Sequence, residues 1–190
     1  MRILMLGNSL TSAHDLPARL AERTGAEVVA HTRGGARLAE QLNPQTGLGA
    51  RTLAALKTAS WDFVVMQEMS IGPVRSKQRF LESVTRLCSL VREHGAAPVL
   101  YATWAYKPGS KKLESSGFTY DELHKRLHDA YYEAADLTGA LVADVGSAFY
   151  ERAAEEQLNL RDGVHPSRRG TELIAEVIAQ TIEGESSYTP

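Results

Sequence analysis

Five short apolar runs alternate along the chain with segments that have helical periodicity. The runs cover residues 2–7, 27–30, 62–66, 98–103 and 140–143. They are continuously apolar, which is typical of strands buried on both faces of a parallel sheet. The pattern therefore predicts an α/β protein in which helices cover a five-stranded parallel sheet.

Three of the intervening segments repeat their apolar positions with a period of 3.6 residues. The first has an apolar face made of Phe80, Leu81, Val84, Leu87, Cys88 and Val91. The second opens with a capping-box pattern at 119–122 and continues through Leu123, Leu127, Tyr131, Ala134 and Leu137. The third starts near Ser167 and turns inward Leu173, Ile174, Val177, Ile178 and Ile182. These segments are predicted to be helices.

The organisation of the chain indicates one domain. It has 190 residues, of which 43% are hydrophobic and 23% charged, an ordinary globular composition. We find no internal repeat and no linker, so we expect a single domain over 1–183 and a frayed tail at 184–190. The polar, turn-rich segment 105–118 follows a strand end and is expected to overhang the site as a lid or specificity loop.

Charge and cysteine content limit the function classes. A net charge of −2 does not favour binding to nucleic acid or to an acidic membrane, so neither partner is expected. The single cysteine suits a reducing compartment. The first apolar run is too short for a signal peptide and no stretch is long enough to span a membrane, so we expect a cytoplasmic protein. A chain trimmed of its signal peptide would look the same.

The first candidate for chemistry is Ser9, in the turn Gly7-Asn8-Ser9. The turn follows the first strand, and open α/β sheets bind ligands at the carboxyl ends of their strands. Near the other end of the chain, Asp162 and His165 follow the last strand. A serine becomes a good nucleophile when a base accepts its proton and an acid orients that base. The plainer alternatives are a turn at Asp162 and ordinary helix caps at Ser9 and Ser167.

Acyl transfer also needs donors for the developing oxyanion, and three sources follow strand ends. The first is the backbone N–H of Ser9, and the second is the pair Gly34-Gly35. The third is the side-chain amide of Gln67. The alternatives are a flexible glycine turn and a strand-end glutamine that meets water.

The order of these blocks resembles the SGNH (GDSL-type) hydrolases. The resemblance rests on Gly7-Asn8-Ser9-Leu10, Gly34-Gly35, a polar amide after the third strand and Asp162-x-x-His165-Pro166. It implies a flavodoxin-like three-layer α/β/α sandwich and esterase or lipase activity. By this likeness Ser9 is the nucleophile, His165 the base and Asp162 its orienting acid. The N–H groups of Ser9 and Gly35, rather than Gly34, would hold the oxyanion.

The chain departs from the family pattern in two blocks. Gly-Asp-Ser-Leu reads Gly-Asn-Ser-Leu, and Gly-x-Asn-Asp is replaced by Met66-Gln67-Glu68-Met69-Ser70. A divergent branch with a Gln-Glu third block is the closest match. We carry the oxyanion role of the family's asparagine to Gln67. Glu68 either binds substrate or caps the loop, and we favour the cap.

Further residues complete the expected site. We expect Asn8 and Gly34 to border the substrate, and Trp104 and Tyr106 to line the cleft, with plain packing as the alternative. His14 and His31 lie near strand ends and are also candidates for the border of the pocket.

Other features carry no predicted chemistry. His124 and His128 have the spacing of helix metal ligands but lack a third ligand, so no metal is expected. Cys88 is expected in the core. The chain has no Gly-x-Ser-x-Gly elbow and no glycine-rich phosphate loop, which disfavours a common α/β-hydrolase and a nucleotide cofactor.

The sequence thus predicts a cofactor-free serine esterase that acts on a small-molecule ester. We expect a short acyl group, such as acetyl on a carbohydrate, because the chain offers no extended apolar lid. One alternative is a protein that binds acylated carbohydrate without turnover, which the altered third block favours. Another is an acyltransferase in which an alcohol replaces water.

Overall fold

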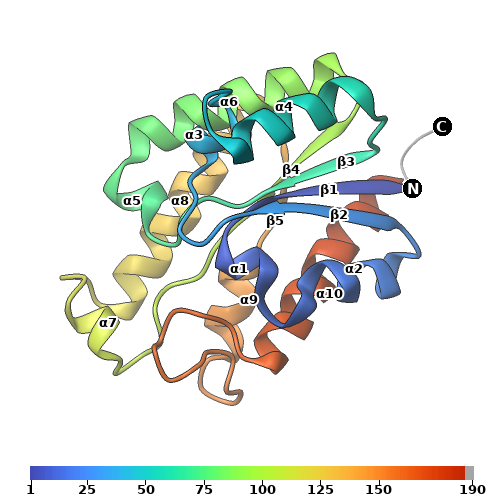
Figure 1. The fold of residues 1–190 in the computed structure, drawn as a ribbon. Helices are drawn as coiled ribbons and strands as arrows, with labels where there is room; N and C mark the ends of the chain where they lie inside the picture. Colours follow the sequence, from blue (N-terminus) through green and yellow to red (C-terminus); the bar gives the residue numbers. More distant parts are fainter. Residues whose placement is uncertain (187–190) are drawn as a thin grey trace.

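A computed structural model describes residues 1–186 as a three-layer α/β/α sandwich (Figure 1). The sheet has five strands in the order β2-β1-β3-β4-β5, and every neighbouring pair is parallel. The strands are β1 Arg2–Gly7, β2 Glu27–Thr32, β3 Phe63–Met66, β4 Ala97–Tyr101 and β5 Leu141–Ala143. The predicted sheet and fold class are confirmed.

The two faces of the inner strand β1 bury alternate residues in two cores. Ile3 and Met5 join the core on one face, whereas Leu4 and Leu6 join the core on the other. All four side chains are 0% exposed. Side chains alternate across a strand, so a strand covered on both faces must be apolar at every position. This is the physical origin of the continuous apolar runs.

Helices cover both faces of the sheet. One layer contains α2 (Leu16–Thr24), α9 (Val145–Arg152) and α10 (Arg168–Ser186), and the other contains α3 (Leu38–Gln41), α4 (Gly47–Thr58), α6 (Lys77–Glu93) and α8 (Tyr120–Thr138) (Figure 1). Shorter helices follow strand ends: α1 (Ser9–Ser12), the 3₁₀ turn Ala13–Asp15, α5 (Gly72–Arg75) and α7 (Lys111–Glu114). No helix in residues 1–186 is both long and apolar enough to cross a membrane.

The predicted helices are present, but one residue predicted on a buried helix face is exposed. The capping box of α8 is formed, since Thr119 Oγ1 accepts from the Glu122 N–H (3.2 Å) and the Glu122 carboxylate accepts from the Thr119 N–H (2.8 Å). Leu137, expected inside, is 63% exposed. The inward stripe continues from Ala134 to the half-buried Thr138, four residues on, so Leu137 points to solvent.

The C-terminal boundary also differs from the expectation. Helix α10 continues to Ser186, beyond the predicted domain end at 183. Part of the predicted frayed tail is therefore helical. Residues 187–190 of that tail lie outside the described residues.

Candidate active site

Ser9 follows the carboxyl end of strand β1, in a turn that requires glycine at position 7. A Cβ added to Gly7 would lie 2.2 Å from Thr11 Oγ1 and 2.7 Å from Gln67 Oε1. Asn8 is the N-cap of α1, and its side-chain oxygen accepts from the Leu10 N–H (3.1 Å). Strand end, glycine and cap together fix Ser9 as the first residue of α1.

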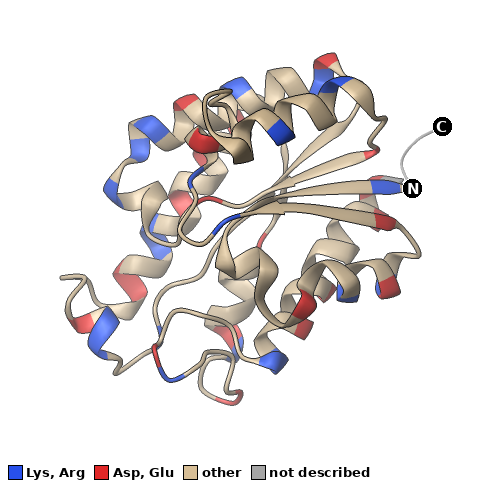
Figure 2. Cartoon of the chain, in the orientation of Figure 1, with Lys and Arg blue, Asp and Glu red and all other residues tan. Residues whose placement is uncertain are grey.

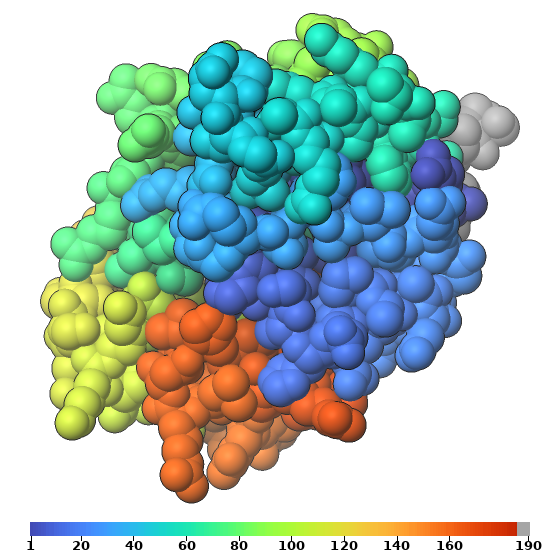
Figure 3. All heavy atoms as spheres, viewed as in Figure 1, coloured from blue at the N-terminus to red at the C-terminus, as the bar shows by residue number. Residues whose placement is uncertain are grey.

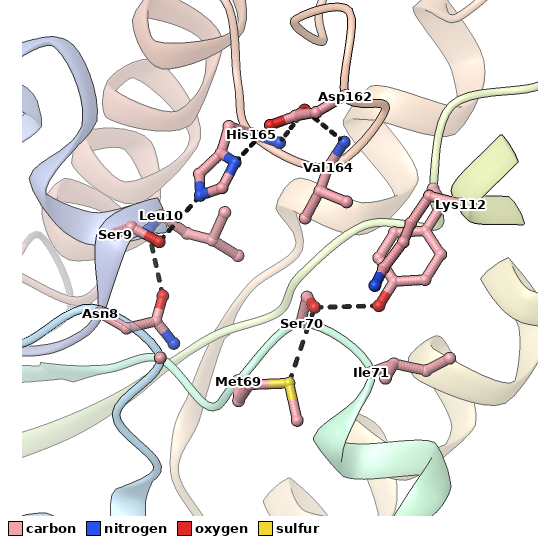
Figure 4. Close-up of a pocket in the computed structure, with 12 residues that line it drawn as sticks. Asn8, Ser9, Leu10, Met69, Ser70, Ile71, Lys112, Asp162, Val164 and His165 are labelled. Carbon is pink, nitrogen blue, oxygen red and sulfur yellow. Dashed lines mark hydrogen bonds and ion pairs between the residues drawn. The ribbon is translucent and has the colours of Figure 1, made fainter. Parts of the chain in front are cut away.

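The structure brings Ser9, His165 and Asp162 into one chain of hydrogen bonds (Figure 4). Ser9 Oγ lies 2.9 Å from His165 Nε2. On the other side of the ring, His165 Nδ1 lies 2.6 Å from Asp162 Oδ2. The N-terminal turn and the segment before α10 are adjacent on the surface, where Figure 3 shows deep blue against orange. Residues 156 positions apart are thus placed for proton transfer.

The loop around Asp162 defines the orientation of the imidazole. Asp162 Oδ1 accepts from the N–H groups of Val164 (2.9 Å) and His165 (3.0 Å). Partial burial opposes ionisation, but these bonds and the bond from the His165 ring outweigh it, so the pKa of Asp162 is lowered. An ionised Asp162 accepts the Nδ1 proton, which leaves Nε2 free to accept from Ser9. These contacts have the geometry that a serine nucleophile, its base and an orienting acid require.

A pocket of about 550 Å³ opens beside this chain of hydrogen bonds. The exposed surface of its lining is largely apolar, and its polar side chains lie on opposite sides, Ser9 and His165 on one and Ser70 and Lys112 on the other (Figure 4). The lining residues are Asn8, Ser9, Leu10, Gly35, Met69, Ser70, Ile71, Tyr106, Lys112, Asp162, Val164 and His165. The pocket is large enough for a small ester and exposes it to Ser9.

Two backbone N–H groups border the pocket near Ser9. Gly35 lines the pocket with a positive φ of 68°, a conformation that suits glycine. Within residues 1–186, no acceptor takes the backbone N–H of Ser9 or of Gly35. Both donors are therefore available to a developing oxyanion.

Comparison with known proteins assigns the family. Residues 5–173 match the GDSL-like Lipase/Acylhydrolase family. The chain belongs to this family. It is therefore an ester hydrolase of the SGNH/GDSL type. A comparison with curated proteins gave no match.

Solved structures agree with this assignment. A protein from Slackia heliotrinireducens, described as belonging to the SGNH hydrolases, is 51% identical, with a TM-score of 0.93 over 96% of this chain and 98% of that one. A lipase/acylhydrolase from Enterococcus faecalis is 17% identical (TM-score 0.67, 97% of both chains). A mutant of an acetyl-xylooligosaccharide esterase from Geobacillus is 15% identical (TM-score 0.67, 95% of this chain and 93% of that one). The last two show the shared fold alone.

Gln67 does not reach the pocket of this GDSL-type hydrolase, contrary to expectation. It is 1% exposed, and its Oε1 accepts from the Asn8 N–H (3.0 Å) and from Thr11 Oγ1 (2.9 Å). Its Nε2 donates to the Glu68 carbonyl. These partners also fix the orientation of the amide, because the Asn8 N–H only donates and the carbonyl only accepts. Gln67 therefore supports the turn that carries Ser9 and offers no donor to the oxyanion.

Gly34 and Glu68 do not line the pocket either, which corrects the expected place of Gly34 beside the substrate and leaves the cap as the role of Glu68, the alternative that we favoured. The Glu68 carboxylate accepts from the N–H groups of Leu38 (3.0 Å) and Met69 (2.9 Å), so it caps α3 and its own loop. Burial raises its pKa against the opposing effect of these bonds. Asn8 does line the pocket, although its amide is held by the Ala36 carbonyl (3.0 Å).

The two aromatic candidates have different positions. Tyr106 lines the pocket as predicted, and its hydroxyl lies 3.2 Å from Ser70 Oγ. Trp104 does not line it, which corrects the prediction. It is 3% exposed, stacks on Phe149 with ring centroids 4.2 Å apart, and donates its indole N–H to the Val164 carbonyl. Its contact with the pocket is indirect, through the loop that carries His165.

The sequence analysis did not identify Lys112, which lines the pocket from α7. Its ammonium lies 5.7 Å from the centre of the Tyr106 ring, within range of a cation–π contact. Lys112 could have been identified by its place in segment 105–118, which the sequence predicts to overhang the site.

The remaining candidates lie away from the pocket. His14 is exposed, and the buried His31 bonds to Thr52. His124 and His128 stack on tyrosine rings, with centroids 4.1 and 4.2 Å apart. Cys88 is 1% exposed in the core, as predicted.

Proposed function

We propose that the protein cleaves carboxylic esters through a triad of Ser9, His165 and Asp162. The observation that supports this most directly is the continuous path from Ser9 Oγ to His165 Nε2 (2.9 Å) and from His165 Nδ1 to Asp162 (2.6 Å). Ser9 and His165 also line the pocket, and the chain belongs to a family of lipases and acylhydrolases.

In the proposed reaction, Ser9 Oγ attacks the ester carbonyl while His165 Nε2 takes its proton. The N–H groups of Ser9 and Gly35 hold the oxyanion of the tetrahedral intermediate. His165 then gives the proton to the alcohol as the alcohol departs, and the acyl group remains bound to Ser9 Oγ. A water molecule gives a proton to His165 and attacks the acyl-enzyme, and His165 returns this proton to Ser9 Oγ as the carboxylic acid is released. Asp162 stays ionised and stabilises the imidazolium.

The proposed substrate is a short acyl ester, with acetyl on a carbohydrate as the leading candidate. The apolar lining beside Ser9 comes from Leu10, Met69, Ile71 and Val164, and the pocket volume of about 550 Å³ suits a small group. The Geobacillus neighbour named as an acetyl-xylooligosaccharide esterase shares the fold and supports this choice.

The test is hydrolysis of p-nitrophenyl acetate, butyrate and octanoate by the wild type, Ser9→Ala and His165→Ala. We expect turnover of the short esters, and a fall in kcat of about 10⁴-fold or more in each variant with circular dichroism unchanged. A wild type that is no faster than the variants would contradict the esterase mechanism.

Two further measurements separate the alternatives. A fluorophosphonate labels a serine activated by its base, so rapid labelling of Ser9 argues against a protein that only binds. Product analysis with added alcohols tests the transferase. Hydrolysis that continues with no ester exchange would exclude that alternative.

A further inference from the structure

A second cavity, of about 410 Å³, adjoins the catalytic pocket, and Gly35 lines both. Gly35 belongs to the loop between β2 and α3, so this loop contributes to the lining of both cavities. Its lining has a different chemistry from the catalytic pocket, because almost every side chain is polar or charged. Besides Gly35, the lining residues are Arg33, Arg37, Ala39, Glu40, Asn43, Thr46 and Arg79.

Two of the three arginines that line this cavity have no ionic partner. Arg33 is paired with Glu40, with Nε 2.8 Å from Oε1 and a second contact beside it. Within residues 1–186, the guanidinium groups of Arg37 and Arg79 form no ion pair and no hydrogen bond. Each keeps a planar set of N–H donors that matches a carboxylate or a phosphate.

Arg37 and Arg79 do have one electrostatic neighbour. They favour the ionised form of the buried Glu68, whose pKa is nevertheless raised by burial. The Glu68 carboxylate receives its hydrogen bonds from Leu38 and Met69, however, so the guanidinium donors remain unused. Figure 2 shows Lys and Arg segments at the loop after β2 and along α6, in a chain whose net charge is −2.

We propose that this cavity is a subsite for a carboxylate or phosphate on the alcohol portion of the ester. This inference rests on the proposed function. The largely apolar surface of the catalytic pocket suits the acyl group, whereas the polar cavity that shares Gly35 with this pocket suits an acidic sugar that carries the acyl group. Arg37 and Arg79 would bind the anion, and Arg33 would stay with Glu40. The substrate class is thus an acylated acidic carbohydrate.

A matched set of three acetyl esters tests the proposed subsite. They are the mono-O-acetyl esters of glucose, of glucuronic acid and of glucose 6-phosphate, and the release of acetate is measured. We expect kcat/KM to be about ten-fold or more higher for an acidic sugar than for glucose. The two acidic sugars distinguish a carboxylate site from a phosphate site. The preference should weaken as NaCl rises, because added salt screens the attraction.

Variants locate the effect. Arg37→Gln and Arg79→Gln should each lower the acidic-to-neutral ratio of kcat/KM, while Arg37→Lys should retain part of it. The control is Arg23→Gln on α2, in the opposite helix layer, which removes the same charge and should keep the ratio. A ratio near one in the wild type, or a ratio unaffected by Arg37→Gln and Arg79→Gln, would overturn the subsite.

A binding measurement keeps this result separate from the proposed function. Folded Ser9→Ala protein is titrated calorimetrically with glucuronate, glucose 6-phosphate and glucose. Stronger binding of an acidic sugar, lost in Ser9→Ala/Arg37→Gln, would support the subsite even if no ester were cleaved. Equal binding of all three sugars would overturn it even if p-nitrophenyl acetate were hydrolysed.

Discussion

The indole N–H of Trp104 donates to the carbonyl of Val164 at 3.1 Å. Val164 lies between Asp162 and His165, and its own N–H donates to Asp162. Trp104 is itself packed against Phe149 in the core. The bond therefore ties the loop that carries Asp162 and His165 to the core, and we infer that Trp104 positions this loop.

We expect Trp104→Phe to lower kcat about ten-fold with little change in KM, because the loop loses its anchor while the pocket lining is unchanged. The loss of the hydrogen bond should also lower the free energy of unfolding by about 1 kcal/mol. Steady-state kinetics and urea denaturation measure the two effects.

Trp61→Phe is the matched control. Trp61 is also buried and donates its indole N–H to a backbone carbonyl, that of Ala55 (3.0 Å), but on the other face of the sheet. It should lose similar stability and keep its kcat. Equal kinetic loss in both variants would argue against the positioning role of Trp104.

The role of Gln67 predicts a stability effect. Gln67→Leu leaves the buried N–H of Asn8 and the Glu68 carbonyl without partners, and each unsatisfied group costs about 1–3 kcal/mol. We expect a clear fall in the melting temperature, whereas kcat should fall by less than about 100-fold. An oxyanion donor would behave differently, with kcat lower by about 10²–10³ and stability unchanged.

Most of the fold was predictable from the sequence. The runs of β1, β3 and β4 could be recognised because both faces of these strands are buried, which requires apolar residues at nearly every position. The capping box at Thr119 could be predicted from the sequence because its hydrogen bonds join residues only three positions apart. Leu137 was misplaced because the inward stripe steps from Ala134 by four residues to Thr138, whereas a step of three residues to Leu137 fits the helical period equally well.

The candidate site was predictable where the chemistry is local. Asp162 and His165 share one loop, so their spacing alone predicts contact. Gln67 and Trp104 were misjudged because each follows a strand end, and such a residue can turn toward the pocket or beneath it. The direction is decided by distant partners, Asn8 for Gln67 and Val164 for Trp104, which the sequence does not specify.

The glycine pair provides another test, because its two members differ in conformation. Gly35 has a positive φ and lines the pocket, whereas Gly34 has neither property, and neither has an atom within 4 Å of an added Cβ. Gly35→Ala should cost about 1–2 kcal/mol of strain and turn its N–H away from the oxyanion, so kcat should fall about 10- to 100-fold. Gly34→Ala should change kcat little, and equal effects would argue against Gly35 as a donor.

His31 gives a prediction for stability against pH that is independent of catalysis. Burial, with a smaller effect of Arg51, lowers its pKa to about 4. Its Nδ1–H donates to Thr52 (3.0 Å), whose hydroxyl donates to Gln41 Oε1 (2.6 Å), and burial keeps the ring neutral.

An unfolded chain, in which the histidine pKa is about 6.5, takes up a proton between pH 6.5 and 4 that the folded protein excludes. The free energy of unfolding should therefore fall as the pH drops through this window, by up to about 1.4 kcal/mol per pH unit from His31. In His31→Asn, an amide N–H replaces the Nδ1–H and cannot titrate, so this part of the slope should disappear. Urea denaturation of both proteins at pH 7, 6 and 5 measures it, and parallel slopes would show that His31 is not the group responsible.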